Sequence, residues 1–335
     1  MDETLAPTSL RPVVPETPVP ETPTTVAAAT SAPTDVVLTN SPVSAPTFAP
    51  TAAVPAIPTM GPTFGNTELC FCVIADVPYF ESEAIELPNQ IATQMEDCEF
   101  LVHLGDIMKG EIACEEEHFL LIKDLMLESK VPTFVVPGDN EWNDCGDRFE
   151  IAAAWTLWKK HLLGFENQWV NHTFSVARQF PEYPENFYFV RKRTLVIGLN
   201  VVGGRVHDEA EWLIRLAAEV EWIRELVTMN VPLNADGVIV MAHSKPTEDH
   251  TAFFEPLAEY VGVELGNEIP FLYLHGDGHS FVVENELLGQ PNFLRIQHEG
   301  GVRDPILKIY SDPHTLGPRA STAFTFDRQL QFERK

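Results

Sequence analysis

Five short apolar runs that each end in an aspartate or a histidine restrict the fold of this chain more than any other feature. The runs lie at 69–75, 100–104, 133–136, 237–242 and 271–274. Each has the length and the continuous apolar character of a strand buried inside a sheet. Segments with helical periodicity separate the first three runs, so strand and helix alternate along the chain. This alternation predicts an α/β domain.

The first two helices can be placed from apolar spacing and end signals. The segment 88–96 opens with Pro88, a residue that the first turn of a helix tolerates. The segment 115–129 carries apolar residues on one face. We therefore expect both segments to be helices packed against the strands.

The second half of the chain contains one long expected helix and several strands. A hairpin is expected at 187–202. A helix is expected to begin after Asp208, because Glu211 three positions later completes a capping-box pattern, and to stop near residue 230. Residues 281–331 show strands and turns without a helical period. This last segment is expected to complete a second sheet.

Residues 1–64 differ in composition from the rest of the chain. They hold almost half of the 27 prolines, and most of the other residues are Thr, Ala, Val and Ser. Proline removes backbone donors, and a stretch with few large apolar side chains cannot bury a core. We predict a disordered Pro/Thr-rich tail at 1–64, either a plain linker or an O-glycosylated stalk, followed by one domain at 65–335.

The chain is strongly acidic, with a formal net charge of −27. This charge repels the phosphate backbone of nucleic acids and anionic membrane surfaces, so we expect no nucleic-acid partner. No apolar run of about 18 residues is present, so we expect no membrane span. Residues 1–30 lack the basic-then-apolar order of a signal peptide.

Five cysteines are present, without the spacing of a metal knuckle or the density of a disulfide scaffold. Cys114 and Cys145 follow Asp106 and Asp139 closely, so we expect them on neighbouring loops as the candidate disulfide, which would indicate an oxidising compartment. The other cysteines are expected to be buried thiols. The sequon at Asn171 is a candidate N-glycosylation site. These features favour a secreted or cell-surface location.

The residues that follow the apolar runs are informative only when they are considered together. Taken singly, an aspartate after a strand is usually a turn former or a helix cap, and a lone histidine is usually a hydrogen-bonded core residue. In an α/β sheet, however, side chains at the carboxyl ends of strands face the crevice where ligands bind. The candidate metal ligands are therefore Asp76, Asp106, Asp139, His243, Asp277 and His279.

The order of these motifs resembles the calcineurin-like metallophosphoesterase superfamily, whose pattern runs DxH, GDxx, GNH(E/D), a lone His after a strand, then GHxH. The resemblance extends from residue 69 to about 312, and it implies a four-layer α/β/β/α sandwich. The matching stretches here are Asp76-Val77-Pro78, Gly105-Asp106, Gly138-Asp139-Asn140-Glu141, Ala242-His243 and Gly276-Asp277-Gly278-His279.

The resemblance also implies a role for each ligand. Asp106 would bridge two divalent metal ions. Asp76 and His279 would complete the first metal position. The second position would take the remaining ligands, Asp139, His243 and Asp277.

Four departures from the family pattern bear on activity. Pro78 stands in place of one histidine ligand, and Asp139 and Asp277 stand in place of an asparagine and a histidine ligand. Asn140 stands where the family has the histidine that assists the leaving group, so it is the candidate catalytic residue and would orient the phosphate by its amide. Four carboxylates would nearly neutralise two divalent ions. This oxygen-rich set favours hard ions and leaves Mn, Mg, Fe, Ca and Zn open.

Together these features predict a metal-dependent phosphoesterase. A metal-bound hydroxide would attack the phosphorus of a small phosphate ester or a phosphoprotein. The departures leave an alternative of another class, in which the chain is a catalytically degenerate member of the fold and serves as a binding or structural module at the cell surface. The sequence does not indicate an oligomeric state.

Overall fold

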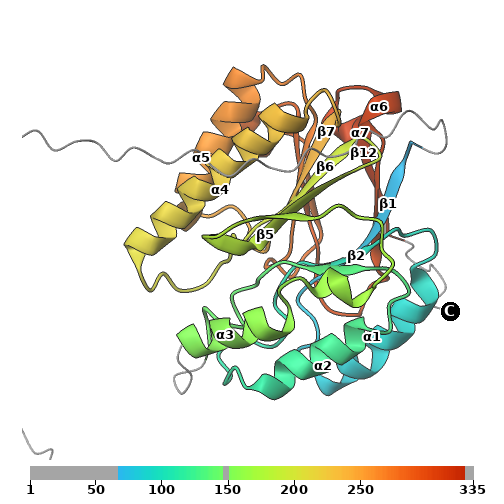
Figure 1. Ribbon diagram of the computed structural model, residues 1–335, viewed down its shortest axis with the longest axis vertical. Helices are drawn as coiled ribbons and strands as arrows, with labels where there is room; N and C mark the ends of the chain where they lie inside the picture. Colours follow the sequence, from blue (N-terminus) through green and yellow to red (C-terminus); the bar gives the residue numbers. More distant parts are fainter. Residues whose placement is uncertain (1–66, 146–150, 329–335) are drawn as a thin grey trace, which may run out of the picture. The chain divides into compact units, whose positions relative to one another are not determined.

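The computed structural model describes residues 67–145 and 151–328, which form two β-sheets with helices on both outer faces (Figure 1). The tail predicted at 1–64 lies outside the described residues. No helix in the described ranges is long and apolar enough to cross a membrane.

The first sheet has the strand order β12-β11-β1-β2-β3. Strands β1, β2 and β3 run parallel, β11 pairs antiparallel with β1, and β12 pairs antiparallel with β11. Helices α1 to α3 cover the outer face of this sheet (Figure 1). The bounds are β1 Leu69–Ile74, β2 Leu101–His103, β3 Thr133–Val135, β11 Leu307–Ser311, β12 Phe324–Asp327, α1 Glu81–Gln94, α2 Glu116–Met126 and α3 Ile151–His161.

The second sheet has the order β4-β5-β6-β7-β8-β10-β9, with β6, β7, β8 and β10 parallel. Helices α4 and α5 cover its outer face (Figure 1). The bounds are β4 Ala177–Gln179, β5 Tyr183–Arg191, β6 Thr194–Gly198, β7 Gly237–Met241, β8 Phe271–His275, β9 Val282–Glu284, β10 Phe293–Gln297, α4 Glu209–Asn230 and α5 Thr251–Glu259. Short helical turns lie at Phe165–Gln168, Glu248–His250, Tyr260–Glu264 and Leu287–Gly289.

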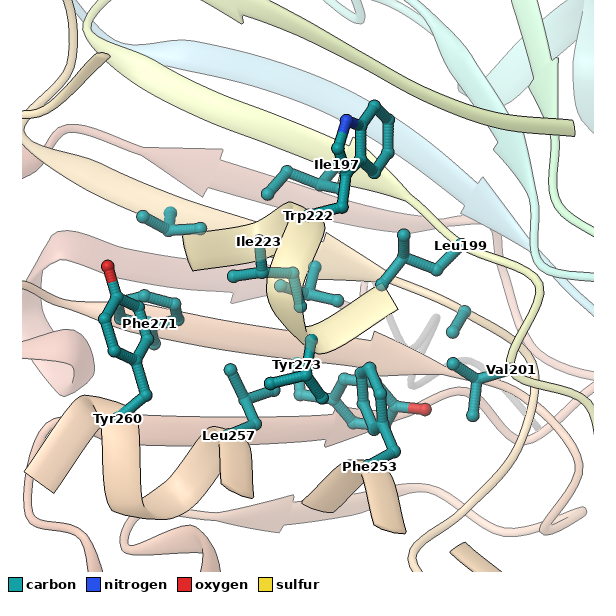
Figure 2. Close-up of a cluster of buried hydrophobic side chains, with 14 of the residues drawn as sticks. Ile197, Leu199, Val201, Trp222, Ile223, Phe253, Leu257, Tyr260, Phe271 and Tyr273 are labelled. Atoms are coloured by element: carbon teal, nitrogen blue, oxygen red, sulfur yellow. The ribbon is translucent and has the colours of Figure 1, made fainter. Parts of the chain in front are cut away.

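Alternation along the strands divides the core into three layers of side chains. In β8, Leu272 and Leu274 point between the two sheets, whereas Phe271 and Tyr273 point towards α4 and α5. Figure 2 shows this outer layer, with Phe271 and Tyr273 among side chains from both helices, including Ile223. Strands β1, β2 and β3 are likewise buried on both faces, which explains their predominantly apolar sequences. The four-layer α/β/β/α sandwich predicted from the sequence is confirmed.

The first helix begins earlier than the sequence indicated. Helix α1 starts at Glu81, so Pro88 lies inside it and not in its first turn. The start is fixed by Glu83, whose Oε2 accepts hydrogen bonds from the backbone N–H groups of Tyr79 and Phe80, at 2.6 and 3.2 Å. Glu83 therefore satisfies backbone donors that the first turn leaves free.

The predictions for the second half are confirmed except near the C-terminus. Strands β5 and β6 form the expected hairpin, and Asp208 caps α4 by accepting from the backbone N–H groups of Ala210 and Glu211. Segment 281–331, however, does not simply complete the second sheet. Strands β9 and β10 join that sheet, whereas β11 and β12 join the first one, and the short helices α6 (Pro313–Leu316) and α7 (Ala320–Ala323) lie between them. Sequence alternation specifies strands but not their long-range partners.

Two disulfides are present, one of which the sequence analysis singled out. Cys114 is bonded to Cys145, joining the loops that follow β2 and β3. Cys72 on β1 is bonded to Cys98, which lies just before β2. The expectation of buried thiols is therefore wrong for this second pair and holds for Cys70. The pair meets because β1 and β2 are neighbouring strands, which their spacing in the sequence does not reveal.

Candidate metal centre

The strand-end side chains converge at one edge of the paired sheets. Ligand atoms of Asp76, Asp106 and His243 lie within 4.8 Å of one another, and so do those of Asp139, His243 and Asp277. Five of the six predicted ligands therefore belong to one cluster, with His243 common to both groups. We call Asp76 with Asp106 the first position, and Asp139 with His243 and Asp277 the second position.

The backbone turns sharply at several of the candidate ligands that follow the strands. Asp76, Asp106 and Asp277 have φ angles of 53°, 61° and 62°, and His279 has a φ of 48°. These values lie in the left-handed region, which is uncommon for residues other than glycine and which aspartate tolerates better than most. Such outliers gather where the surrounding structure holds a functional geometry.

Two glycines allow the loops after β2 and β3 to touch. A Cβ on Gly105 would lie 2.5 Å from the backbone of Gly138, and a Cβ on Gly138 would lie 2.1 Å from the backbone nitrogen of Asp106. The buried Glu141 side chain joins the same loops, because it accepts from the N–H groups of Gly138 at 2.6 Å and Asp106 at 3.1 Å. The sequence motif assigns Glu141 neither a ligand role nor a catalytic role. Its position shows that it sets the spacing between Asp106 and Asp139.

The second position has the atoms of a cation site. His243 Nδ1 donates to the carbonyl oxygen of Leu104 at 2.7 Å, which leaves Nε2 to face the carboxylates. Nε2 lies 3.0 Å from Asp139 Oδ1, yet neither buried atom has a hydrogen-bond partner among the described residues. A Cβ on Gly203 would lie 3.3 Å from both Asp139 Oδ1 and Asp277 Oδ2, so the glycine leaves space beside these oxygens. The second position therefore fits a divalent ion.

Buried charge at the centre shifts the protonation of its groups. Burial alone would lower the pKa of His243, but the carboxylates of Asp106 and Asp139 raise it well above its usual value. Burial raises the pKa of Asp139, and the negative charge of Asp106 raises it further. Burial raises the pKa of Asp76 to about 8, with opposition from His243. Without a cation the cluster retains protons, so binding of a divalent ion would release protons.

The first position is arranged differently, because protein groups already engage its oxygens. The Tyr79 hydroxyl donates to Asp106 Oδ2 at 2.7 Å and lies 3.3 Å from Asp76 Oδ1. Asn140 Nδ2 also donates to Asp106 Oδ2, at 2.6 Å, and lies within hydrogen-bond distance of Tyr79 and Met108. These residues leave Asp106 Oδ2 with no free direction for an ion. The first position does not fit a cation in this arrangement.

Two residues near the centre were not recognised as part of it from the sequence. Tyr79 directly follows Pro78, which stands where the family pattern has a histidine ligand. A polar side chain next to that position was the sequence feature that could have indicated its role. Lys245 belongs to none of the sequence motifs, but its Nζ lies 3.6 Å from Asp277 Oδ1 and its backbone N–H donates to Asp277 Oδ2. In contrast, His279 is 59% exposed, and its Nδ1 lies 3.7 Å from Asp76 Oδ1, outside both converging groups.

No protein family profile matches this chain, and no curated protein matches it in sequence. Solved structures that are similar to it in part include a phosphatase and an anchor protein. The purple acid phosphatase PPD1 from yellow lupin (Lupinus luteus) seeds is 12% identical, with a TM-score of 0.42, over 73% of this chain and 49% of the lupin chain. GAP50, the anchor in the inner membrane complex of Plasmodium, is 12% identical, with a TM-score of 0.44, over 78% of this chain and 88% of GAP50. This chain thus spans about half the length of the lupin phosphatase.

Proposed function

We propose that this chain is a metal-dependent phosphoesterase, a divergent member of the calcineurin-like superfamily, with its ion held by Asp139, His243, Asp277 and Asp106. The observation that supports this proposal most is a pair of buried atoms at the second position, Asp139 Oδ1 and His243 Nε2, which lie 3.0 Å apart and make no hydrogen bond. A divalent ion there would supply Lewis-acid activation of water and of a phosphoryl oxygen. The oxygen-rich ligand set favours Mn²⁺ or Mg²⁺.

The substrate would meet a positively charged side chain beside the second position. The Lys245 side chain is 43% exposed and lies against Asp277, so its ammonium group can contact a phosphate oxygen. Asn140 keeps its predicted role of orienting the phosphate only if an amide hydrogen leaves Asp106 or Met108 when substrate binds. The proposed substrate is a small phosphate ester or a phosphoprotein.

The rival function is a catalytically degenerate module that binds an ion for stability. One observation favours it, namely that the amide of Asn140 is buried and engaged by its neighbours where the family pattern has an acid. A missing general acid typically lowers rates by about 10²- to 10⁴-fold, and a substrate with a good leaving group avoids most of that loss.

Hydrolysis of p-nitrophenyl phosphate in Mn²⁺ separates the two functions. We expect turnover by the wild type and a loss of roughly 100-fold in Asp139→Asn, which keeps the shape of the ligand but removes its charge. Asp97→Asn is the matched control, because Asp97 is an exposed carboxylate away from the centre. Absence of turnover in a wild-type sample shown to contain Mn²⁺ would establish the module instead.

We also propose that the chain works at the cell surface or after secretion. The two disulfides indicate an oxidising compartment, and Asn171 of the sequon is exposed. A chain expressed through a eukaryotic secretory pathway should lose mass on treatment with an N-glycosidase. The variant Asn171→Gln should show no such loss, and an unglycosylated wild type would contradict the proposal.

A further inference from the structure

The Tyr79 hydroxyl lies between the two carboxylates that the family pattern assigns to a metal ion. It donates to Asp106 Oδ2 at 2.7 Å, and Asp76 Oδ1 is 3.3 Å away on its other side. Asn140 Nδ2 lies 3.1 Å from the same hydroxyl oxygen. The hydroxyl thus has the neighbours that a cation at the first position would have.

We propose that Tyr79 takes the place of the first cation, so that this centre holds one ion, at the second position. The inference rests on the proposed function only in that it takes the second position to be a metal site. It differs from the expectation of two ions, and it assigns Tyr79 a positioning role that the family pattern does not contain.

Counting the donors on Asp106 supports the replacement. Its Oδ2 accepts from Tyr79 and from Asn140 Nδ2, while its Oδ1 accepts from the backbone N–H of Asn140 at 3.0 Å and faces His243 at 3.2 Å. A carboxylate oxygen has about two lone-pair directions, so Oδ2 is fully used. Asp106 can reach an ion through Oδ1, on the side of the second position, but not through Oδ2.

The other ligands that a first ion would need are missing, already engaged or exposed to solvent. Pro78 replaces a histidine and offers no side-chain donor atom. The Asp76 carboxylate is engaged, because Oδ2 accepts from the backbone N–H of Asp277 at 3.3 Å. His279 is 59% exposed and touches the Tyr79 ring edge-on, with the ring centroids 5.7 Å apart.

The backbone of Tyr79 is held by the first turn of α1. Its N–H donates to Glu83 Oε2 at 2.6 Å, and the N–H of Phe80 donates to the same atom. This cap lies outside the metal centre. The start of α1 therefore fixes where the hydroxyl is placed, independently of the carboxylates that it contacts.

Counting bound Mn²⁺ by calorimetry and by elemental analysis after desalting tests the inference without an activity assay. We expect one ion per wild-type chain and two in Tyr79→Ala, where the space between Asp76 and Asp106 opens. The single variant Asp76→Asn should still bind one ion, because Asp76 does not coordinate the ion at the second position. The double variant Tyr79→Ala/Asp76→Asn should return from two ions to one.

Each other outcome has a defined meaning. Two ions in the wild type, or the same number in the wild type and Tyr79→Ala, would overturn the inference. Loss of an ion in Tyr79→Ala would show that the phenol is itself a ligand and would also overturn it. No ion in the wild type with one in Tyr79→Ala would overturn the inference that the wild-type centre holds one ion, and it would also remove the second position from the proposed function. The wild type could bind one ion that Asp139→Asn removes, while Tyr79→Ala gains none. That result would overturn the inference about Tyr79 but would leave the proposed function intact.

Discussion

Two regions of this molecule bury several acidic side chains, and they satisfy them in different ways. At the metal centre, carboxylates from separate strand ends converge around His243. Beneath α4 lies a second group, which we call the α4 cluster: Glu185, Asn186, Asn200, Arg215 and Glu219. There the chain itself supplies a positive charge, because the buried Arg215, which pairs with Glu211, is close enough to oppose the rise in the pKa of Glu219. The amides of Asn186 and Asn200 donate to the carboxylates of Glu219 and Glu185.

The difference shows that burial of acids alone does not identify a metal site. Glu219 in the α4 cluster is as buried as the groups at the centre, and burial raises its pKa to about 8. Its ligand atoms nevertheless do not converge with two others among residues 67–145 and 151–328. The negative charge of the α4 cluster is therefore offset by protonation and by Arg215, whereas at the proposed metal centre it would be offset by a bound cation.

The largest expected effect is a rise in thermal stability on metal binding, which should depend on the metal centre and not on the α4 cluster. Mn²⁺ at 100 times its Kd should stabilise the wild type by about 2.7 kcal/mol, measured as a rise in Tm against a sample in EDTA. Asp139→Asn should abolish this rise, and Glu219→Gln should keep it. A metal-induced rise that survives Asp139→Asn but not Glu219→Gln would reverse the comparison.

A smaller effect is expected in the pH dependence of stability, to which Glu219 of the α4 cluster contributes. Glu219 has a folded pKa of about 8, above its unfolded value of 4.5, so the folded state binds an extra proton between these values. The stability that this proton supplies is complete below about pH 4.5 and is lost as pH rises through 8, at up to about 1.4 kcal/mol per pH unit.

Glu219→Gln should therefore raise Tm at pH 9 and change it little at pH 5, both measured in EDTA. The amide resembles the protonated acid in shape and carries no charge at either pH. An equal change at the two pH values would mean that Glu219 is not protonated in the folded protein near neutrality.

The smallest expected effect tests the space at the second position without removing a ligand. Gly203→Ala would place a methyl group 3.3 Å from Asp139 Oδ1 and Asp277 Oδ2. We expect calorimetry to show Mn²⁺ binding weakened by about 10-fold, with Tm in EDTA unchanged. Unchanged affinity would show that the ion does not lie on the Gly203 side of these oxygens.

Much of the fold and the convergence of the candidate ligands could be predicted, because both depend on local patterns. Continuous apolar runs identify β1 and β7, and the position after a strand places Asp76 and His243 at the same edge. The site details could not be predicted in this way. The role of Tyr79 depends on the loop after β1 and on the cap from Glu83, which only the folded chain brings together.

Long-range pairing was the other part that local patterns did not specify. The Cys72–Cys98 bond and the return of β11 to the first sheet both depend on which strands become neighbours. The same limit applies to Lys245, whose distance from Asp277 is set by the pairing of β7 with β8. From the sequence alone, Lys245 cannot be distinguished from an ordinary surface lysine.

The bond between Cys114 and Cys145 has a practical consequence for handling the protein. It closes a segment with a sequence separation of 31 residues that includes β3 and the loop carrying Asp139 and Asn140. A thiol reducing agent would open this bond and release the loop that carries two residues of the proposed centre. Purification and metal titration should therefore be carried out in buffers free of dithiothreitol and mercaptoethanol, with the oxidised state verified by mass spectrometry.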